Sequence, residues 1–339
     1  MKSLLKSILP LTLFCLISSS TFAARPVRIN IGTLAPRGSA VYKSLKSMAD
    51  EWKKISGGKV KLVIYPDGTQ GGEADMVRLM KLGSLQGGGL TSVGLGEIVP
   101  EIKGMQGLPL LIRSYEELDH LTTKLGPTFE PLFEKKGFVF LFWADAGWIH
   151  FFSKEKMTTP DDLKKMKFFV WAGDSEHAEM VKKAGYRGIP LETADIQTGL
   201  QTGLIDVADM PPMFALAGQI DRRAPHMLDL KWAPLIGGMV IKKDAWEKIP
   251  KEIRPQLLAS AQKAGAAMRA SNRKESTQAI EAMKKRGLNV HNTSEELTAV
   301  WRKEAEDKVY PLMIGHSVPT PIYKQVTELL EAFRASQPK

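Results

Sequence analysis

Apolar and polar residues alternate in two short segments near the start of the chain, from Val27 to Ile31 and from Lys59 to Tyr65. A period of two residues is typical of β-strands. Ser39 is placed to cap a helix between these segments. Apolar residues recur there at helical spacing, at Tyr42, Leu45, Met48 and Trp52. The order strand, helix, strand predicts a right-handed βαβ unit.

The same kind of pattern continues beyond this unit. A second helix is predicted from Glu73 to Leu82, and Gly83 follows as its stop signal. A short apolar strand is expected from Leu90 to Val93, within a glycine-rich stretch. The order βαβαβ predicts an open α/β lobe.

A second set of elements begins near Phe138. Apolar runs at 138–143, 150–152 and 168–171 are separated by polar turns and predict strands. Asp174 or Ser175 caps a helix that runs to Lys183, and another helix is expected from Ala194 to Thr202. The chain thus forms two α/β lobes and passes between them more than once, which is the hinge geometry of a protein that closes on a ligand.

A long run of helix-favouring residues, 252–286, predicts one long helix or two abutting ones that end at Gly287. Thr293 with Glu296 predicts a capping box for the next helix. We therefore divide the chain into lobe I, lobe II, the long helix, and a C-terminal strand with helices. The boundaries are 24–145 for lobe I, completed by about 232–260, then 146–231 for lobe II, 252–286 for the helix and 287–339 for the C-terminal part.

The first 23 residues differ from the rest. Lys2 and Lys6 precede the apolar run Ile8 to Ile17, and small residues lead to Ala23, as in a cleaved secretory signal peptide. An apolar run of about ten residues is roughly half the length of a membrane-spanning helix. We therefore expect export to the periplasm. The single cysteine, Cys15, lies within the signal, so the mature chain has no disulfide and no cysteine-based site.

The sequence contains no pattern of residues that is typical of an enzyme active site. The six histidines are not spaced like metal ligands, and neither a nucleophile elbow nor a phosphate-binding or dinucleotide motif occurs. The net charge of +10 arises from Lys and Arg scattered among acids, which indicates a solvated surface rather than a nucleic-acid site. Asp206 follows a buried strand, where a structural role is favoured. We expect no catalytic residue, no metal site and no cofactor.

Four motifs occur in a recognisable order. They are Tyr65-Pro66-Asp67-Gly68-Thr69-Gln70-Gly71-Gly72-Glu73, Gly107-Leu108-Pro109-Leu110-Leu111-Ile112-Arg113-Ser114-Tyr115-Glu116, Thr159-Pro160-Asp161-Asp162-Leu163-Lys164-Lys165-Met166-Lys167 and Thr198-Gly199-Leu200-Gln201-Thr202-Gly203-Leu204-Ile205-Asp206. With these motifs the chain resembles the dicarboxylate-binding (DctP-like) substrate-binding subunits of tripartite ATP-independent periplasmic (TRAP) transporters. The resemblance implies an α/β fold with two lobes that clamp a solute, a long helix that bridges them, and delivery of the ligand to a membrane permease.

The chain departs from this family's pattern at three positions of the cleft. Phe169 stands where the family has an arginine that pairs with a ligand carboxylate, Ile149 replaces a second arginine, and Met210 follows Asp209 in place of an asparagine. Loss of the guanidinium leaves the desolvation of a buried carboxylate uncompensated, at several kcal/mol. The departures predict a hydrophobic or amphipathic ligand, although these side chains could instead fill the lobe cores.

The resemblance also assigns residues to the cleft. The predicted ligand-binding residues are Leu34, Gln70, Thr91, Trp148, Ile149, Phe169, Trp171, Met210, Phe214 and Trp232. Strict alternation along the strand at 168–171 does not allow Phe168 and Phe169 to face the cleft together. Three alternatives stay open: a carboxylate ligand held by other residues, a periplasmic adaptor without transport, and a tetratricopeptide-repeat protein as an additional partner, as in an arginine-poor branch of the family.

Overall fold

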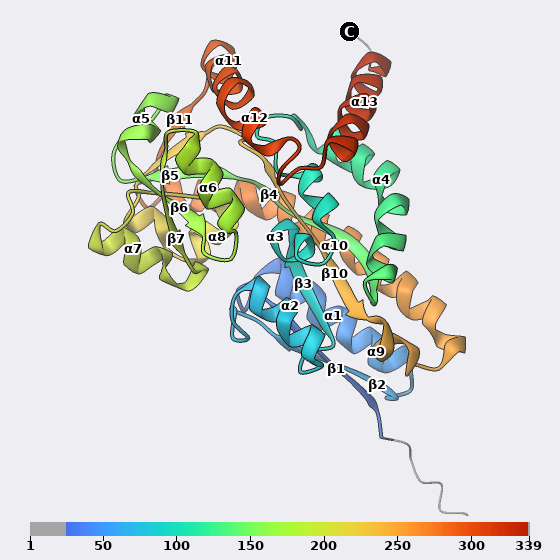
Figure 1. The fold of residues 1–339 in the computed structure, drawn as a ribbon. Coiled ribbons are helices and arrows are strands. Elements are labelled where there is room, and N and C mark those ends of the chain that lie inside the picture. The colour runs from blue at the N-terminus through green and yellow to red at the C-terminus, as the bar shows by residue number, and fades with distance from the viewer. Residues whose placement is uncertain (1–24, 338–339) are drawn as a thin grey trace, which may run out of the picture.

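The computed structural model describes residues 25–337 and contains two β-sheets, one at the centre of each lobe (Figure 1). The sheet of lobe I has the strand order β2-β1-β3-β10-β4. Strands β1, β2 and β3 are parallel, whereas β10 runs antiparallel to both of its neighbours. The bounds are β1 Val27–Thr33, β2 Val60–Tyr65, β3 Gly87–Thr91, β4 Phe138–Trp148 and β10 Pro234–Lys242.

The helices of lobe I begin and end largely where local signals place them. Ser39 accepts a hydrogen bond from the backbone N–H of Tyr42 at 3.2 Å and so caps α1. Helix α2 ends at Gly83, which adopts φ of 84°. The bounds are α1 Ala40–Ile55, α2 Glu73–Leu82, α3 Ser92–Gly96, η1 Pro100–Met105, α4 Tyr115–Lys135 and α9 Lys243–Glu247. Helix α4 was not predicted.

The sheet of lobe II has the strand order β11-β9-β5-β8-β6-β7. Its strands are β5 His150–Ser153, β6 Lys167–Trp171, β7 Arg187–Leu191, β8 Val207–Met210, β9 His226–Asp229 and β11 Asn289–Asn292. Its helices are α5 Pro160–Lys165, α6 Ser175–Lys183, η2 Thr193–Asp195, α7 Ile196–Thr202, α8 Pro212–Ala217 and η3 Ile220–Arg222. Asp174 caps α6 by accepting a hydrogen bond from the backbone N–H of His177 at 3.0 Å, which resolves the choice between Asp174 and Ser175.

A single long helix, α10 (Arg254–Lys284), follows the short turn η4 (Lys251–Ile253) and contacts α1 and β4 of lobe I and α8 of lobe II (Figure 1). Gly265 lets this helix approach the sheet closely. A Cβ atom at that position would lie 2.5 Å from Cδ2 of Phe142. The helix therefore bridges the lobes, as the family resemblance implies.

The C-terminal part packs against both lobes. Helix α11 (Glu295–Glu304), the π-helical turn η5 (Ala305–Val309) and α12 (Tyr310–Met313) lead to α13 (Thr320–Ser336), which contacts α4. Ser294, and not Thr293, caps α11 by accepting from the N–H of Leu297 at 3.2 Å. Thr293 instead donates to the backbone carbonyl of Asp229 at 3.0 Å. The predicted capping box is therefore wrong: the helix is capped one residue later, and Leu297 at the third helical position has no side-chain acceptor to complete a box.

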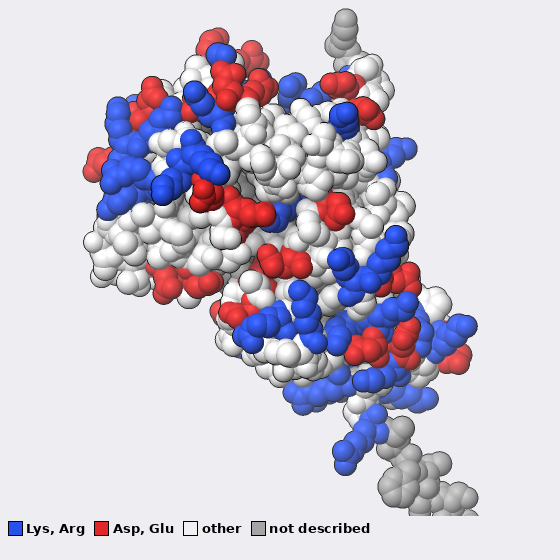
Figure 2. All heavy atoms as spheres, in the orientation of Figure 1, with Lys and Arg blue, Asp and Glu red and all other residues white. Residues whose placement is uncertain are grey.

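Lys and Arg are interspersed with Asp and Glu over the visible surface (Figure 2), as the scattered charges in the sequence indicate. Within residues 25–337, no helix combines the length and the apolar character needed to cross a membrane. The predicted signal peptide lies outside the described residues.

Candidate functional site

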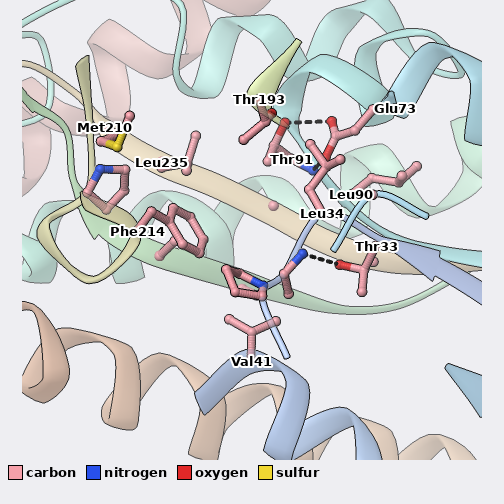
Figure 3. A pocket seen from close by; sticks show the side chains of 18 of the residues that line it. Thr33, Leu34, Val41, Glu73, Leu90, Thr91, Thr193, Met210, Phe214 and Leu235 are labelled. Atoms are coloured by element: carbon pink, nitrogen blue, oxygen red, sulfur yellow. Dashed lines mark hydrogen bonds between the residues drawn. The ribbon is translucent and has the colours of Figure 1, made fainter. Parts of the chain in front are cut away.

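A cavity of about 640 Å³ lies between the two sheets and takes lining residues from both lobes and from α10 (Figure 3). Its walls include the residues at the carboxyl ends of β1, β3, β6 and β8. Ligands of open α/β sheets bind at such strand ends. The volume falls in the range of small-molecule sites, roughly 300–1,000 Å³. The cavity is therefore the candidate ligand site.

In the lobe I wall, Glu73 is buried and its carboxylate is fully engaged. It accepts hydrogen bonds from the hydroxyl of Thr91 at 2.6 Å (Figure 3), from the N–H of Thr91 at 2.7 Å and from the N–H of Gly94 at 2.7 Å. Burial raises the pKa of Glu73, and these three hydrogen bonds oppose the rise. Glu73 therefore fixes the end of β3 and the start of α3 at the edge of the cavity.

A second carboxylate on the lobe I side, Asp145 of β4, is also paired. Its side chain is 1% exposed and lies 2.9 Å from the guanidinium of Arg273, which belongs to α10. Arg273 also contacts Asp119 at 2.6 Å. Desolvation raises the pKa of Asp145 although Arg273 acts in the opposite direction. This cluster joins the long helix to the sheet rather than presenting a free charge to a ligand.

The lobe II wall is largely aromatic and aliphatic. Phe169 and Trp171 have ring centroids 5.3 Å apart and both line the cavity. Phe168 lies on the opposite face of β6, where its ring meets that of Tyr186 at 6.1 Å. The alternation along β6 thus separates Phe168 from Phe169, as predicted. Met210 and Phe214 extend the apolar wall through the start of α8 (Figure 3).

Asp209, at the end of β8, differs from the carboxylates of lobe I. No hydrogen bond from another described residue reaches its carboxylate. Burial raises the pKa of Asp209 to about 7, and its own backbone N–H provides the opposing contribution. Asp206 has the structural role that the sequence favours, because its carboxylate accepts from the N–H of Lys167 at 3.0 Å.

Among the described residues that line the cavity, none is Lys, Arg or His, whereas six are acidic. The acidic residues are Asp67, Glu73, Asp145, Glu192, Asp195 and Asp209. The site therefore offers no cationic side chain to an anionic ligand. Within residues 25–337, no group of three or more His, Cys, Asp or Glu is arranged to hold a metal ion.

The structure brings most of the predicted site residues together. Those that line the cavity are Leu34, Thr91, Ile149, Phe169, Trp171, Met210 and Phe214. Trp232 instead lines a second cavity of about 140 Å³. Gln70 and Trp148 line neither cavity: the Gln70 amide donates to the carbonyl of Thr69, and the Trp148 ring is buried against Tyr115, with centroids 5.5 Å apart.

Sequence reasoning also missed several lining residues. Glu73, Met268 and Asn272 line the cavity but were not predicted to do so. Met268 and Asn272 belong to α10, and nothing in a continuous helical pattern indicates which face meets a cavity.

The chain is similar in sequence to periplasmic binding proteins. The C4-dicarboxylate-binding periplasmic protein DctP of Rhodobacter capsulatus is 20% identical over 311 residues, which cover 91% of this chain and 89% of that protein. The 2,3-diketo-L-gulonate-binding periplasmic protein YiaO of Escherichia coli is 25% identical over 280 residues, 80% of this chain and 83% of that protein.

Solved structures share the fold. A TRAP periplasmic solute binding protein from Xanthobacter autotrophicus Py2, crystallised with bound β-D-galacturonate, superposes with a TM-score of 0.81 at 22% identity and covers 91% of this chain and 100% of its own. The model of bacterial extracellular solute-binding protein family 7 (DctP) matches residues 31–314. Its members bind small molecules for TRAP transport in the periplasm, work with membrane permease components and are not enzymes. The chain therefore belongs to bacterial extracellular solute-binding protein family 7, the DctP-like binding subunits of TRAP transporters.

Proposed function

We propose that this TRAP binding subunit captures an organic ligand with a predominantly apolar body in the cavity between its lobes and delivers it to a membrane permease. The observation that carries the proposal is the absence of Lys, Arg and His from the described cavity lining, together with the aromatic wall of lobe II. The two relatives are named for the binding of organic acids, and the solved structure contains the sugar acid galacturonate. We therefore propose a different class of ligand for this chain.

The physical reason lies in desolvation. A carboxylate that enters a closing cleft loses its water, at an effective cost of several kcal/mol, and needs a cation or several hydrogen-bond donors in return. An apolar group needs no such partner, and each buried methylene contributes about 0.8 kcal/mol. Trp171 and Phe214 supply the matching surface, and Phe169 backs this wall from the lobe II core, where its side chain is 1% exposed.

Residues 1–23 act as a cleaved signal peptide, and lobe I (24–145, completed by about 232–260) closes against lobe II (146–231) across the long helix 252–286, with 287–339 as the C-terminal part. A periplasmic tetratricopeptide-repeat partner stays a prediction from the family resemblance.

A displacement titration tests the ligand class. The mature protein is loaded with the uncharged fluorescent dye N-phenyl-1-naphthylamine and challenged with decanol, succinate or galacturonate. We expect decanol to displace the dye and the two acids to leave it bound. Displacement by succinate or galacturonate, with decanol inactive, would overturn the proposal.

Phe169→Arg is the matched variant for this titration. It places an unpaired cation in the apolar wall, so decanol binding should weaken and acid binding should become measurable. Unchanged dye and decanol affinities would mean that Phe169 does not contact the ligand. A thermal melt identifies a variant that has failed to fold.

A further inference from the structure

The two cavities adjoin each other. Ile149, Trp171 and Asp209 line both the large cavity and the smaller one of about 140 Å³. The small cavity has room for a few non-hydrogen atoms, since one water molecule takes about 30 Å³. A ligand that fills the large cavity with an apolar body can therefore extend a small head group past Asp209.

The strand register places Asp209 on the side of the small cavity. Asp209 lies opposite Phe151 of β5, and Val207, two residues earlier on β8, lies opposite Phe168 of β6. Residues in register share a face of the sheet, and so do residues two apart on one strand. The Asp209 side chain is therefore on the face of Phe151 and Phe168, both of which line the small cavity.

Aromatic residues share the small cavity with Asp209. Phe151, Phe168, Trp171 and Trp232 all line the small cavity, and the rings of Phe151 and Trp232 meet at 5.3 Å. Aromatic faces attract cations within about 6 Å of the ring centroid. A carboxylate among aromatic rings is a favourable setting for an ammonium group.

The charged groups of the small cavity do not neutralise Asp209. Lys103 also lines it, but its ammonium lies 2.9 Å from Glu176 and 3.9 Å from Asp174. His177 lines it too, and burial lowers its pKa, which disfavours the charged imidazole. Asp209 therefore keeps an unpaired carboxylate within the described structure.

We propose that Asp209 binds a protonated amine of the ligand, so that the solute is an apolar compound with an ammonium head group. This inference rests on the proposed function and deepens it. The large cavity takes the apolar body, and the junction between the cavities takes the amine. The ammonium donates to the Asp209 carboxylate and lies in the small cavity, whose lining includes aromatic residues from β5, β6 and the segment before β10, and these contacts replace part of the hydration that it loses.

Three probes with the same alkyl chain test this assignment: decylammonium, decanol and decanoate. Each is titrated at pH 8 into dye-loaded wild-type protein, into Asp209→Asn and into Glu281→Gln. Glu281 is exposed on α10, where it pairs with Lys284, so the last variant changes the net charge equally without touching either cavity. Thermal melts verify that all three proteins are folded.

The expected result is that decylammonium binds wild type at least about tenfold more tightly than decanol, because a hydrogen bond to a charged group contributes about 1.5–3 kcal/mol. Asp209→Asn should remove this preference and leave decanol within about twofold, whereas Glu281→Gln should retain it.

Other results overturn the inference. Equal affinities for decylammonium and decanol in wild type would show that no carboxylate recognises the head group. If Asp209→Asn still preferred decylammonium to decanol, another acidic residue would bind the ammonium group. Tightest binding of decanoate would mean that the head group is an acid. If none of the three probes binds, the proposed function itself fails, so the two failures are distinguishable.

Discussion

The two lobes present different chemistry to the cavity between them. On the lobe I side, Glu73 and Asp145 are buried carboxylates whose oxygens are held by the Thr91 and Gly94 backbone or by Arg273. On the lobe II side, most lining residues are apolar, and the carboxylate of Asp209 is held by no other described residue. Burial of an acid is therefore not by itself a sign of ligand recognition. Lobe I uses Glu73 and Asp145 to hold its own backbone and the long helix, whereas Asp209 of lobe II has no such partner within the described residues.

The largest expected effect comes from breaking the lobe I wall at Glu73. Glu73→Ala leaves the N–H groups of Thr91 and Gly94 without their acceptor, and each buried unsatisfied group costs about 1–3 kcal/mol. We expect a loss of about 3 kcal/mol in the free energy of unfolding, measured by urea denaturation. Glu51→Ala, at an exposed position of α1, is the control. A loss no larger than that of the control would mean that Glu73 does not hold this wall.

Asp209→Asn should act in the opposite direction. The pKa of Asp209 is raised to about 7 from 3.8, so this carboxyl keeps its proton in the folded protein where the unfolded chain has lost it, and its contribution to wild-type stability falls as pH rises from about 4 to about 7. Asn removes this cost and should stabilise the ligand-free protein by about 1–3 kcal/mol at pH 8, with little effect at pH 4.

The pKa of Lys103 is raised and that of His177 is lowered. Both side chains are present in wild type and in Asp209→Asn, so the difference between the two proteins at each pH reports on Asp209. Unfolding curves at pH 4, 6 and 8 provide the measurement. A variant less stable than wild type at pH 8 would show that Asp209 has a structural partner after all.

Gly265→Ala tests how closely the long helix packs against the sheet of lobe I. The added Cβ would lie 2.5 Å from the ring of Phe142, which lines the cavity. Overpacking costs about 1–3 kcal/mol, and the better helix propensity of Ala offsets up to about 1 kcal/mol. A net loss of about 1–2 kcal/mol is expected in urea denaturation, against Lys263→Ala on the exposed face of the same helix. A gain in stability would mean that α10 does not approach the sheet this closely.

Phe214→Ala should produce the smallest change and only in ligand binding. The side chain is half-buried in the lobe II wall. Full burial of an aromatic side chain contributes roughly 1.5–3 kcal/mol, and its truncation removes part of this free energy. We therefore expect the dye to bind about tenfold more weakly. Phe333→Ala is the matched control, because Phe333 is also half-buried but packs on His120, away from both cavities. Equal dye affinities for the two variants would place the ligand elsewhere.

Local signals allowed much of the fold to be predicted. The cap at Ser39 and the stop at Gly83 depend on short-range backbone chemistry, and both were identified correctly. Helix α4 was missed because Pro127 and Pro131 lie inside it. Proline normally breaks a helix, since it lacks an N–H and clashes with the preceding turn. Here packing of Phe129 and Phe133 in the core sustains the helix.

The candidate site was predictable only in part. Departures from the family pattern at Phe169 and Ile149 identified two residues of the cavity wall. The positions of Gln70 and Trp148 depend on how loops and side chains pack around the strand ends, which sequence spacing does not determine. The isolation of Asp209 likewise depends on which side chains of other strands and helices fail to reach it.

The most direct test of the account is native mass spectrometry of the protein purified gently after export in a host that supplies a complex medium, followed by extraction of the bound compound. The account predicts a co-purifying solute with an apolar body that leaves the protein only on denaturation or organic extraction. A small dicarboxylate or a sugar acid as the bound compound would contradict it.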